Sequence, residues 1–164
     1  NVWVFAGSGR YYSKSDKTDV STQYFVGLKD SVLNSGCNQS AGALNCMDNN
    51  LVDVSNATVC VVGVGDCGQA SGTNQVSGVS GATTFTGLIG LVQSKDGWVT
   101  KLVEPANPPT NPVPYGIGER AVSSPTVFGG VVFFPTFIPT NDICVSSGTS
   151  RLWALFYKTG SAYQ

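Results

Sequence analysis

The longest apolar segments of this chain lie in its last third, residues 118–160, and they are rich in β-branched and aromatic side chains. Such residues favour pleated, partly buried strands. Gly129 and Gly130 separate two of the runs, and two residues are the length of a tight hairpin turn. The pattern therefore predicts three strands, over residues 121–128, 131–138 and 151–157.

The strand predicted at residues 131–138 is apolar on both faces, because side chains alternate between the two sides of a strand. The residues of one face are Val131, Phe133, Pro135 and Phe137, and those of the other are Val132, Phe134, Thr136 and Ile138. A strand of this kind is normally enclosed between layers. We therefore expect other elements to cover the C-terminal hairpin on both sides.

Strand patterns recur upstream, whereas helical patterns do not. Residues 23–30 alternate as a half-buried antiparallel strand does, and shorter strand-like runs occupy residues 1–7, 57–64, 85–93 and 98–102. We find no window of ten or more residues that sustains an apolar period of 3.6 residues, so helix should be scarce. The sequence predicts an all-β domain that spans residues 1–164.

Residues 31–87 interrupt this pattern with a stretch rich in Ser, Gly, Asn and Thr. It carries four of the five cysteines, which are Cys37, Cys46, Cys60 and Cys67. Metal-binding cysteine pairs are usually closer in sequence, and the chain has no histidine to complete a site. We interpret the stretch as a loop insertion, with one or two small strands, that disulfides pin in an oxidising, extracytoplasmic compartment. Two disulfides can be drawn from five cysteines in about 15 ways, and all of them stay open. If the four cysteines of the stretch pair with one another, Cys144 has no partner among them.

Composition narrows the classes of function. The chain has 164 residues, enough for one domain with a core. A net charge of −1 and 12% charged residues give no reason to expect nucleic acid or an anionic membrane as partner. No run is long and apolar enough to span a membrane, and a start at Asn1 leads us to expect a processed or excised piece. Without histidine, the chain cannot hold a Ser-His-Asp or Cys-His site of its own.

Several motifs in the chain occur in the order typical of a known family. The N-terminal WVFAGSGRYYSKSDKTDVSTQYFVGLKD resembles the W-V-x-x-G-T-G-R-Y…D…Q-x-x-x-G-x-x-D segment of the PilY1 family. GWVTKL and GERAVSSPTVFGGVVFFPTFIPTNDICVSSGTSRLWALFYKTG are similar to the family's G-W-x-x-x-L and G-E-R-x-x-S-x-P…T-G ending. The matching segments cover roughly half of the chain, at its two ends, and residues 31–87 contain no motif that we can match.

The resemblance implies a fold and a setting. PilY1 proteins are large extracytoplasmic components of type IV pili whose C-terminal domain is a seven-bladed β-propeller. The chain would then supply two to three antiparallel blades, since a blade takes about 40–45 residues in common repeat classes. We therefore expect it to be the C-terminal portion of a propeller, paired with the upstream portion of the same protein in a cleaved or missing chain.

The resemblance also bears on candidate sites. Some family members bind calcium through a D-x-D-x-D-x-x-x-D loop, which this sequence lacks. Asp16 and Asp19 are weak metal candidates that we interpret as solvated loop carboxylates. Calcium is possible, but no complete loop motif supports it. No other cofactor is predicted. Glu119 and Arg120 match a family dipeptide, which we interpret as a structural pair between blades rather than a catalytic one. Arg10, Tyr11 and Tyr12, with Trp98, Tyr115 and Trp153, could form a saccharide or peptide platform, although such aromatics more often pack in a core.

These observations predict an extracytoplasmic pilus-associated protein, exported through the periplasm, that acts in pilus biogenesis, tip adhesion or surface attachment by binding and not by catalysis. Its expected partners are pilins or minor pilins and a host or abiotic surface. One alternative is a structural subunit of an extracellular filament or cap. The other is a fragment of a quinoprotein-like propeller enzyme, for which we find no cofactor motif.

Overall fold

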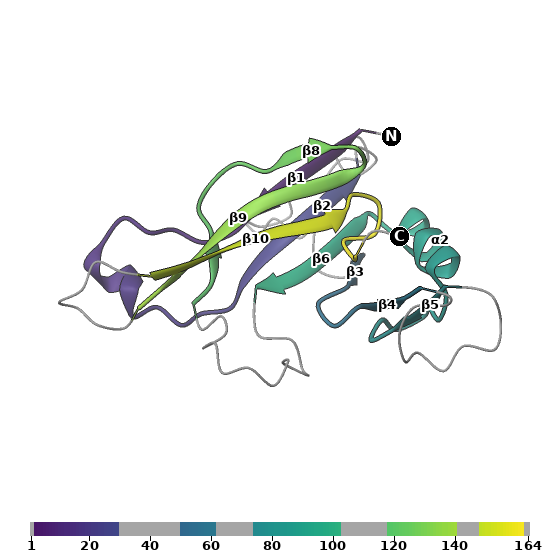
Figure 1. Ribbon diagram of the computed structural model, residues 1–164, viewed down its shortest axis with the longest axis horizontal. Helices are drawn as coiled ribbons and strands as arrows, with labels where there is room; N and C mark the ends of the chain where they lie inside the picture. Colours follow the sequence, from purple (N-terminus) through teal and green to yellow (C-terminus); the bar gives the residue numbers. More distant parts are fainter. Residues whose placement is uncertain (1, 30–49, 62–73, 103–117, 141–147, 163–164) are drawn as a thin grey trace, which may run out of the picture.

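Two four-stranded sheets dominate the computed structural model, which describes residues 2–29, 50–61, 74–102, 118–140 and 148–162. In Figure 1, β9 and β10 of the second sheet lie in front of β1 and β2 of the first. A two-stranded sheet, β4 (Thr58–Cys60) with β5 (Gln75–Ser77), and a short helix accompany them in the described residues. The described part is mostly β, with antiparallel pairing in both large sheets, as the sequence predicted, and its strands do not close into a propeller.

The first sheet has the strand order β1-β2-β6-β3. Its strands are β1 (Trp3–Gly7), β2 (Gln23–Lys29), β6 (Gly97–Leu102) and β3 (Leu51–Asp53). β1, β2 and β6 run antiparallel, whereas β3 pairs in parallel with β6. β3 comes from the stretch predicted to be an insertion, so part of that stretch belongs to the main sheet.

The second sheet is built around the predicted hairpin. β9 (Val131–Pro139) pairs with β10 (Gly148–Phe156) on one side and with β7 (Arg120–Ala121) and β8 (Thr126–Phe128) on the other. Gly129 and Gly130 have φ angles of 59° and 82°, which confirms the glycine hairpin. The strand predicted over residues 121–128 is divided in two, because residues 122–125 leave the sheet before Pro125, which has no N–H to donate.

The strand predicted at residues 85–93 is wrong, because the structure has a helix there, α2 (Phe85–Ser94). The Thr84 side chain caps it by accepting a hydrogen bond of 3.1 Å from the Gly87 amide. Leu88 and Val92, four residues apart, are buried on one side of the helix. Gly87 and Gly90 weaken the helical signal in the sequence, because glycine disfavours helix interiors, and the pattern therefore favours a strand despite the cap and the short apolar face.

An aromatic layer joins the two large sheets. Phe25 of β2 stacks on Phe134 of β9, with ring centroids 3.5 Å apart. Trp98 of β6 is fully buried and donates a hydrogen bond of 2.9 Å to the Tyr157 carbonyl. A Cβ at Gly27 would lie 2.5 Å from the Trp98 indole, and one at Gly160 would lie 2.3 Å from it. Because glycine has no Cβ, these two positions leave room for the Trp98 ring in the core.

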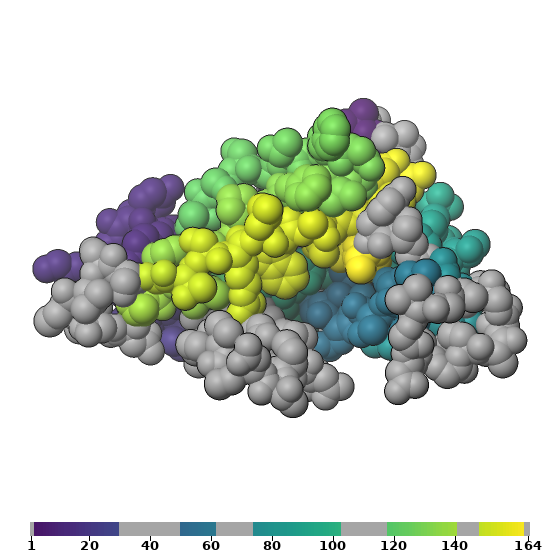
Figure 2. Space-filling view, viewed as in Figure 1, coloured from purple at the N-terminus to yellow at the C-terminus, as the bar shows by residue number. Residues whose placement is uncertain are grey.

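The two faces of β9 are covered unequally in the described part of the chain. Val132, Phe134 and Thr136 face the first sheet and are fully buried. On the opposite face, Phe128 of β8 is 79% exposed and Leu152 of β10 is 70% exposed. In Figure 2 the yellow atoms of β10 form a band across the visible surface. Within the described residues, the expectation that the hairpin is covered on both sides is thus met on one face only.

The predicted disulfide candidates fall almost entirely outside the described residues. Cys60, in β4, is disulfide-bonded. Cys37, Cys46, Cys67 and Cys144 all lie in segments that the structure does not describe. The pairing and the predicted disulfide-pinned insertion therefore stay predictions.

Candidate functional site

A groove of about 840 Å³ lies in the described surface. Its walls are β1, the Gly9–Tyr12 turn, residues 121–125 and the middle of β9. A hollow of this volume lies within the range of ligand sites in proteins. The residues that shape this groove therefore form the candidate site.

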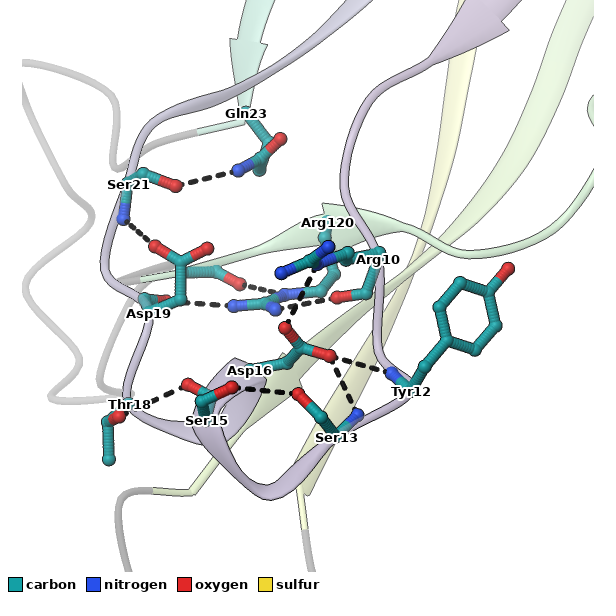
Figure 3. Close-up of polar contacts among 11 residues, drawn as sticks. Arg10, Tyr12, Ser13, Ser15, Asp16, Thr18, Asp19, Ser21, Gln23 and Arg120 are labelled. Atoms are coloured by element: carbon teal, nitrogen blue, oxygen red, sulfur yellow. Dashed lines mark hydrogen bonds and ion pairs between the residues drawn. The ribbon is translucent and has the colours of Figure 1, made fainter.

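Arg120 holds the N-terminal turn against the second sheet. It is 1% exposed, and its guanidinium donates hydrogen bonds of 2.8 Å to the backbone carbonyls of Gly118, Arg10 and Asp19 (Figure 3). Gly9 passes so close that a Cβ there would lie 2.4 Å from the Arg120 Cβ. Arg120 thus fixes one end of the groove rather than facing a ligand.

Asp16 organises the same turn from within. Its carboxylate accepts hydrogen bonds of 2.8 Å from the Tyr12 and Ser13 amides and lies 3.2 Å from Arg10 Nε. These backbone donors, Tyr12 first, lower the pKa of Asp16 to about 2. The carboxylate therefore shapes the loop while it is ionised.

Asp19 has different partners. Its carboxylate accepts a hydrogen bond of 2.9 Å from the Ser21 amide, and hydrogen bonding to Ser21 lowers the pKa of Asp19. Figure 3 shows the Asp16 and Asp19 carboxylates turned toward separate parts of the loop. In the described residues no group of three or more Asp, Glu, Cys or His side chains is placed to hold a metal. The structure does not bring these two candidates together into a cation site.

Glu119 lies on the buried side of the second sheet. It is fully buried and accepts hydrogen bonds from Thr136 Oγ1, from Trp153 Nε1 at 2.8 Å and from Arg151 Nη1 at 2.9 Å. Glu119 and Arg120, although adjacent in sequence, thus bind separate sets of partners. Both sets join distant segments of the chain, and neither side chain reaches open solvent.

The aromatic residues proposed as a platform are divided between the groove and the core. Tyr12 is 92% exposed, and Tyr11 packs edge-on against Phe137 with ring centroids 5.0 Å apart. Trp98 is in the core, and Trp153 is occupied with Glu119. Tyr115 lies outside the described residues.

Sequence reasoning missed two walls of the groove, β1 and residues 122–125. The signal for the second wall was present, since two serines precede Pro125 in a stretch predicted as continuous strand. No sequence signal indicated that β1 would lie beside it, because the two segments are more than a hundred residues apart.

No helix in the described part of the chain is both long and apolar enough to cross a membrane.

Comparison with known proteins gives two likenesses, and no family model matches the chain. It is 36% identical over 70 residues to the type IV pilus biogenesis factor PilY1 homolog of Xylella fastidiosa strain Temecula1. That match covers 42% of this chain and 4% of the relative. The crystal structure of the Pseudomonas aeruginosa PilY1 C-terminal domain aligns over 97% of this chain and 28% of that chain, with a TM-score of 0.46 and 16% identity.

The chain therefore corresponds to a small part of each relative's length. Over part of its length the chain is thus similar to a PilY1 homolog, the family whose motifs its two ends resemble.

Proposed function

We propose that this chain is part of an extracellular, pilus-associated protein that acts by binding and not by catalysis. The observation that carries the proposal is the 36% identity over 70 residues to a type IV pilus biogenesis factor. Because the match covers 4% of that relative, the role of the whole protein is inferred from a small part of it. Pilins or minor pilins are the partners that such a role requires.

The use of the motif residues supports binding rather than catalysis. Gly27, Trp98 and Gly160 pack against one another in the core. Glu119 and Arg120 join separate segments through buried hydrogen bonds. These motif positions maintain the framework, so recognition would fall to surface loops and grooves that the framework holds in place.

A pull-down tests the pilus association. The chain, immobilised under native conditions, should retain pilins or minor pilins from a surface extract of piliated cells and retain none from an isogenic strain without pili. Mass spectrometry of the retained proteins provides the readout. Equal recovery from both strains, or no pilin from either, would contradict the proposal.

The open face of the second sheet favours one further partner, the upstream portion of the same protein. Phe128 and Leu152 are 79% and 70% exposed on this face, and a bound partner would remove their apolar surface from water. Light scattering after size-exclusion chromatography can distinguish this proposal from a self-assembling subunit. The upstream portion should form a one-to-one complex with the chain, whereas a filament or cap subunit would form larger oligomers by itself.

A further inference from the structure

β1 forms one wall of the groove and, among the strands that the structure describes, pairs on one side only. It is at the end of the first sheet, next to β2. The Ser8 amide donates a hydrogen bond of 2.7 Å to the Tyr24 carbonyl, which fixes the alternation of the strand. In an antiparallel pair, every second residue directs its N–H and C=O toward the partner strand. By this alternation Ala6 directs its backbone groups toward β2, and Phe5 and Gly7 direct theirs away.

The outward backbone groups of Phe5 and Gly7 belong to residues that line the groove. Within the described residues, the hydrogen bonds between segments include none to these two residues on that side. Just beyond them, Ser8 accepts a hydrogen bond of 3.2 Å from the Ala121 amide, and the Ala121 side chain packs closely on Gly7. An exposed strand edge of this kind is a template for another extended chain.

Residues 122–125 form the opposite wall. They leave β9 between β7 and β8 and so stand apart from the sheet that both of these strands join. Val122, Ser123 and Ser124 are exposed and line the groove together with Pro125. An extended chain bound along β1 would therefore meet apolar groups and hydroxyls on its other side.

The charge of the lining restricts the occupant further. Arg10 lines the groove with a side chain that is 73% exposed, and no Asp or Glu belongs to the described lining. The nearby Asp16 carboxylate contacts Arg10 Nε from within its own turn. A neutral or acidic occupant is consequently favoured over a basic one.

From these walls and this charge we infer that the groove binds an extended peptide, neutral or acidic, as an additional strand along β1. Backbone pairing would supply affinity, and the side chains of the groove would supply selectivity. A saccharide fits the site less well, because Tyr11 is already packed against Phe137 and, in the described lining, only Tyr12 is a largely exposed aromatic residue. The inference rests on the proposal that the chain acts by binding, and it specifies the class of ligand.

A peptide selection on the purified chain tests the inference. A pool of random acetylated hexapeptides is passed over the immobilised chain, and the retained peptides are resynthesised and titrated. Binding should shift the amide NMR signals of Phe5 and Gly7. A copy of each peptide with alternate backbone nitrogens methylated should bind about tenfold more weakly or worse, because methylation removes the N–H groups that pair with β1.

Two matched variants control for the location of binding. Ser124→Trp places a bulky ring in the groove and should abolish retention, whereas Thr86→Trp adds the same ring on the exposed side of α2 and should leave retention unchanged. Circular dichroism of both variants checks that they fold alike. Failure to retain peptides, retention insensitive to Ser124→Trp, or binding insensitive to N-methylation would overturn the inference.

A glycan array probed with the unsubstituted chain and the two variants tests whether the groove binds saccharides instead of peptides. Glycan binding that Ser124→Trp removes, without peptide binding, would also overturn the inference. Because pilins are absent from these experiments, their failure is distinguishable from a failure of the pull-down.

Discussion

The two faces of β9 differ in how completely the described residues cover them. On the inner face Phe134 stacks on Phe25, and Thr136 donates to the buried Glu119 carboxylate. On the outer face Phe128 and Leu152 remain largely in solvent. The inner face therefore accounts for the cohesion of the two sheets, whereas the outer face contributes apolar surface that only another element could bury. Stability and association should accordingly depend on different residues.

The largest effect should follow from removing the indole that the inner layer surrounds. Trp98→Ala leaves a cavity between Gly27 and Gly160, and should lower the free energy of unfolding by about 4 kcal/mol. Urea denaturation followed by circular dichroism measures this change. Tyr12→Ala, at a side chain that is 92% exposed, should change it by less than about 0.5 kcal/mol. Equal losses in the two variants would remove the distinction between core and surface.

The next effect concerns the buried carboxylate. Arg151→Met removes the guanidinium that lies 2.9 Å from Glu119 and leaves a buried charge without its ion pair. The expected loss is about 3 kcal/mol, since breaking a buried pair costs far more than breaking an exposed one. Lys101→Met is the matched control, because its pair with Asp53 is exposed on both sides and should contribute less than about 1 kcal/mol. A smaller loss for Arg151→Met than for Lys101→Met would contradict this account.

A smaller effect should appear as a dependence on pH at the N-terminal turn. The pKa of Asp16 falls from 3.8 to about 2 on folding, so its contribution to stability is complete above pH 4 and is lost as the pH drops toward 2. Asp16→Asn should therefore be less stable than the unsubstituted chain at pH 6, with a difference that narrows below pH 4. Urea midpoints measured from pH 6 to pH 2 give this difference directly. A constant difference over that range would show that the ionised form is not what organises the turn.

The sequence predicted local features better than it predicted the site. Gly129 and Gly130 indicated the hairpin because a two-residue turn is specified by adjacent residues. The helix α2 was missed because its cap at Thr84 and its two glycines give opposing signals. The partners of Arg120 are carbonyls near positions 10, 19 and 118, and backbone carbonyls carry no signature in a sequence. The groove depends on the same long-range placement of β1 beside residues 122–125, so a sequence alone could not reveal it.

The smallest effect on stability is expected on the outer face, and it is the most informative about a partner. Phe128→Ser should change the free energy of unfolding of the isolated chain by no more than about 0.5 kcal/mol, because the side chain is already 79% exposed. The same substitution should weaken the complex with the upstream portion of the protein, which calorimetric titration can measure. Val2→Ser, at another exposed apolar position, provides the comparison. If Phe128→Ser destabilises the isolated chain by several times that amount while leaving the complex intact, then the outer face is part of the core and not a docking surface.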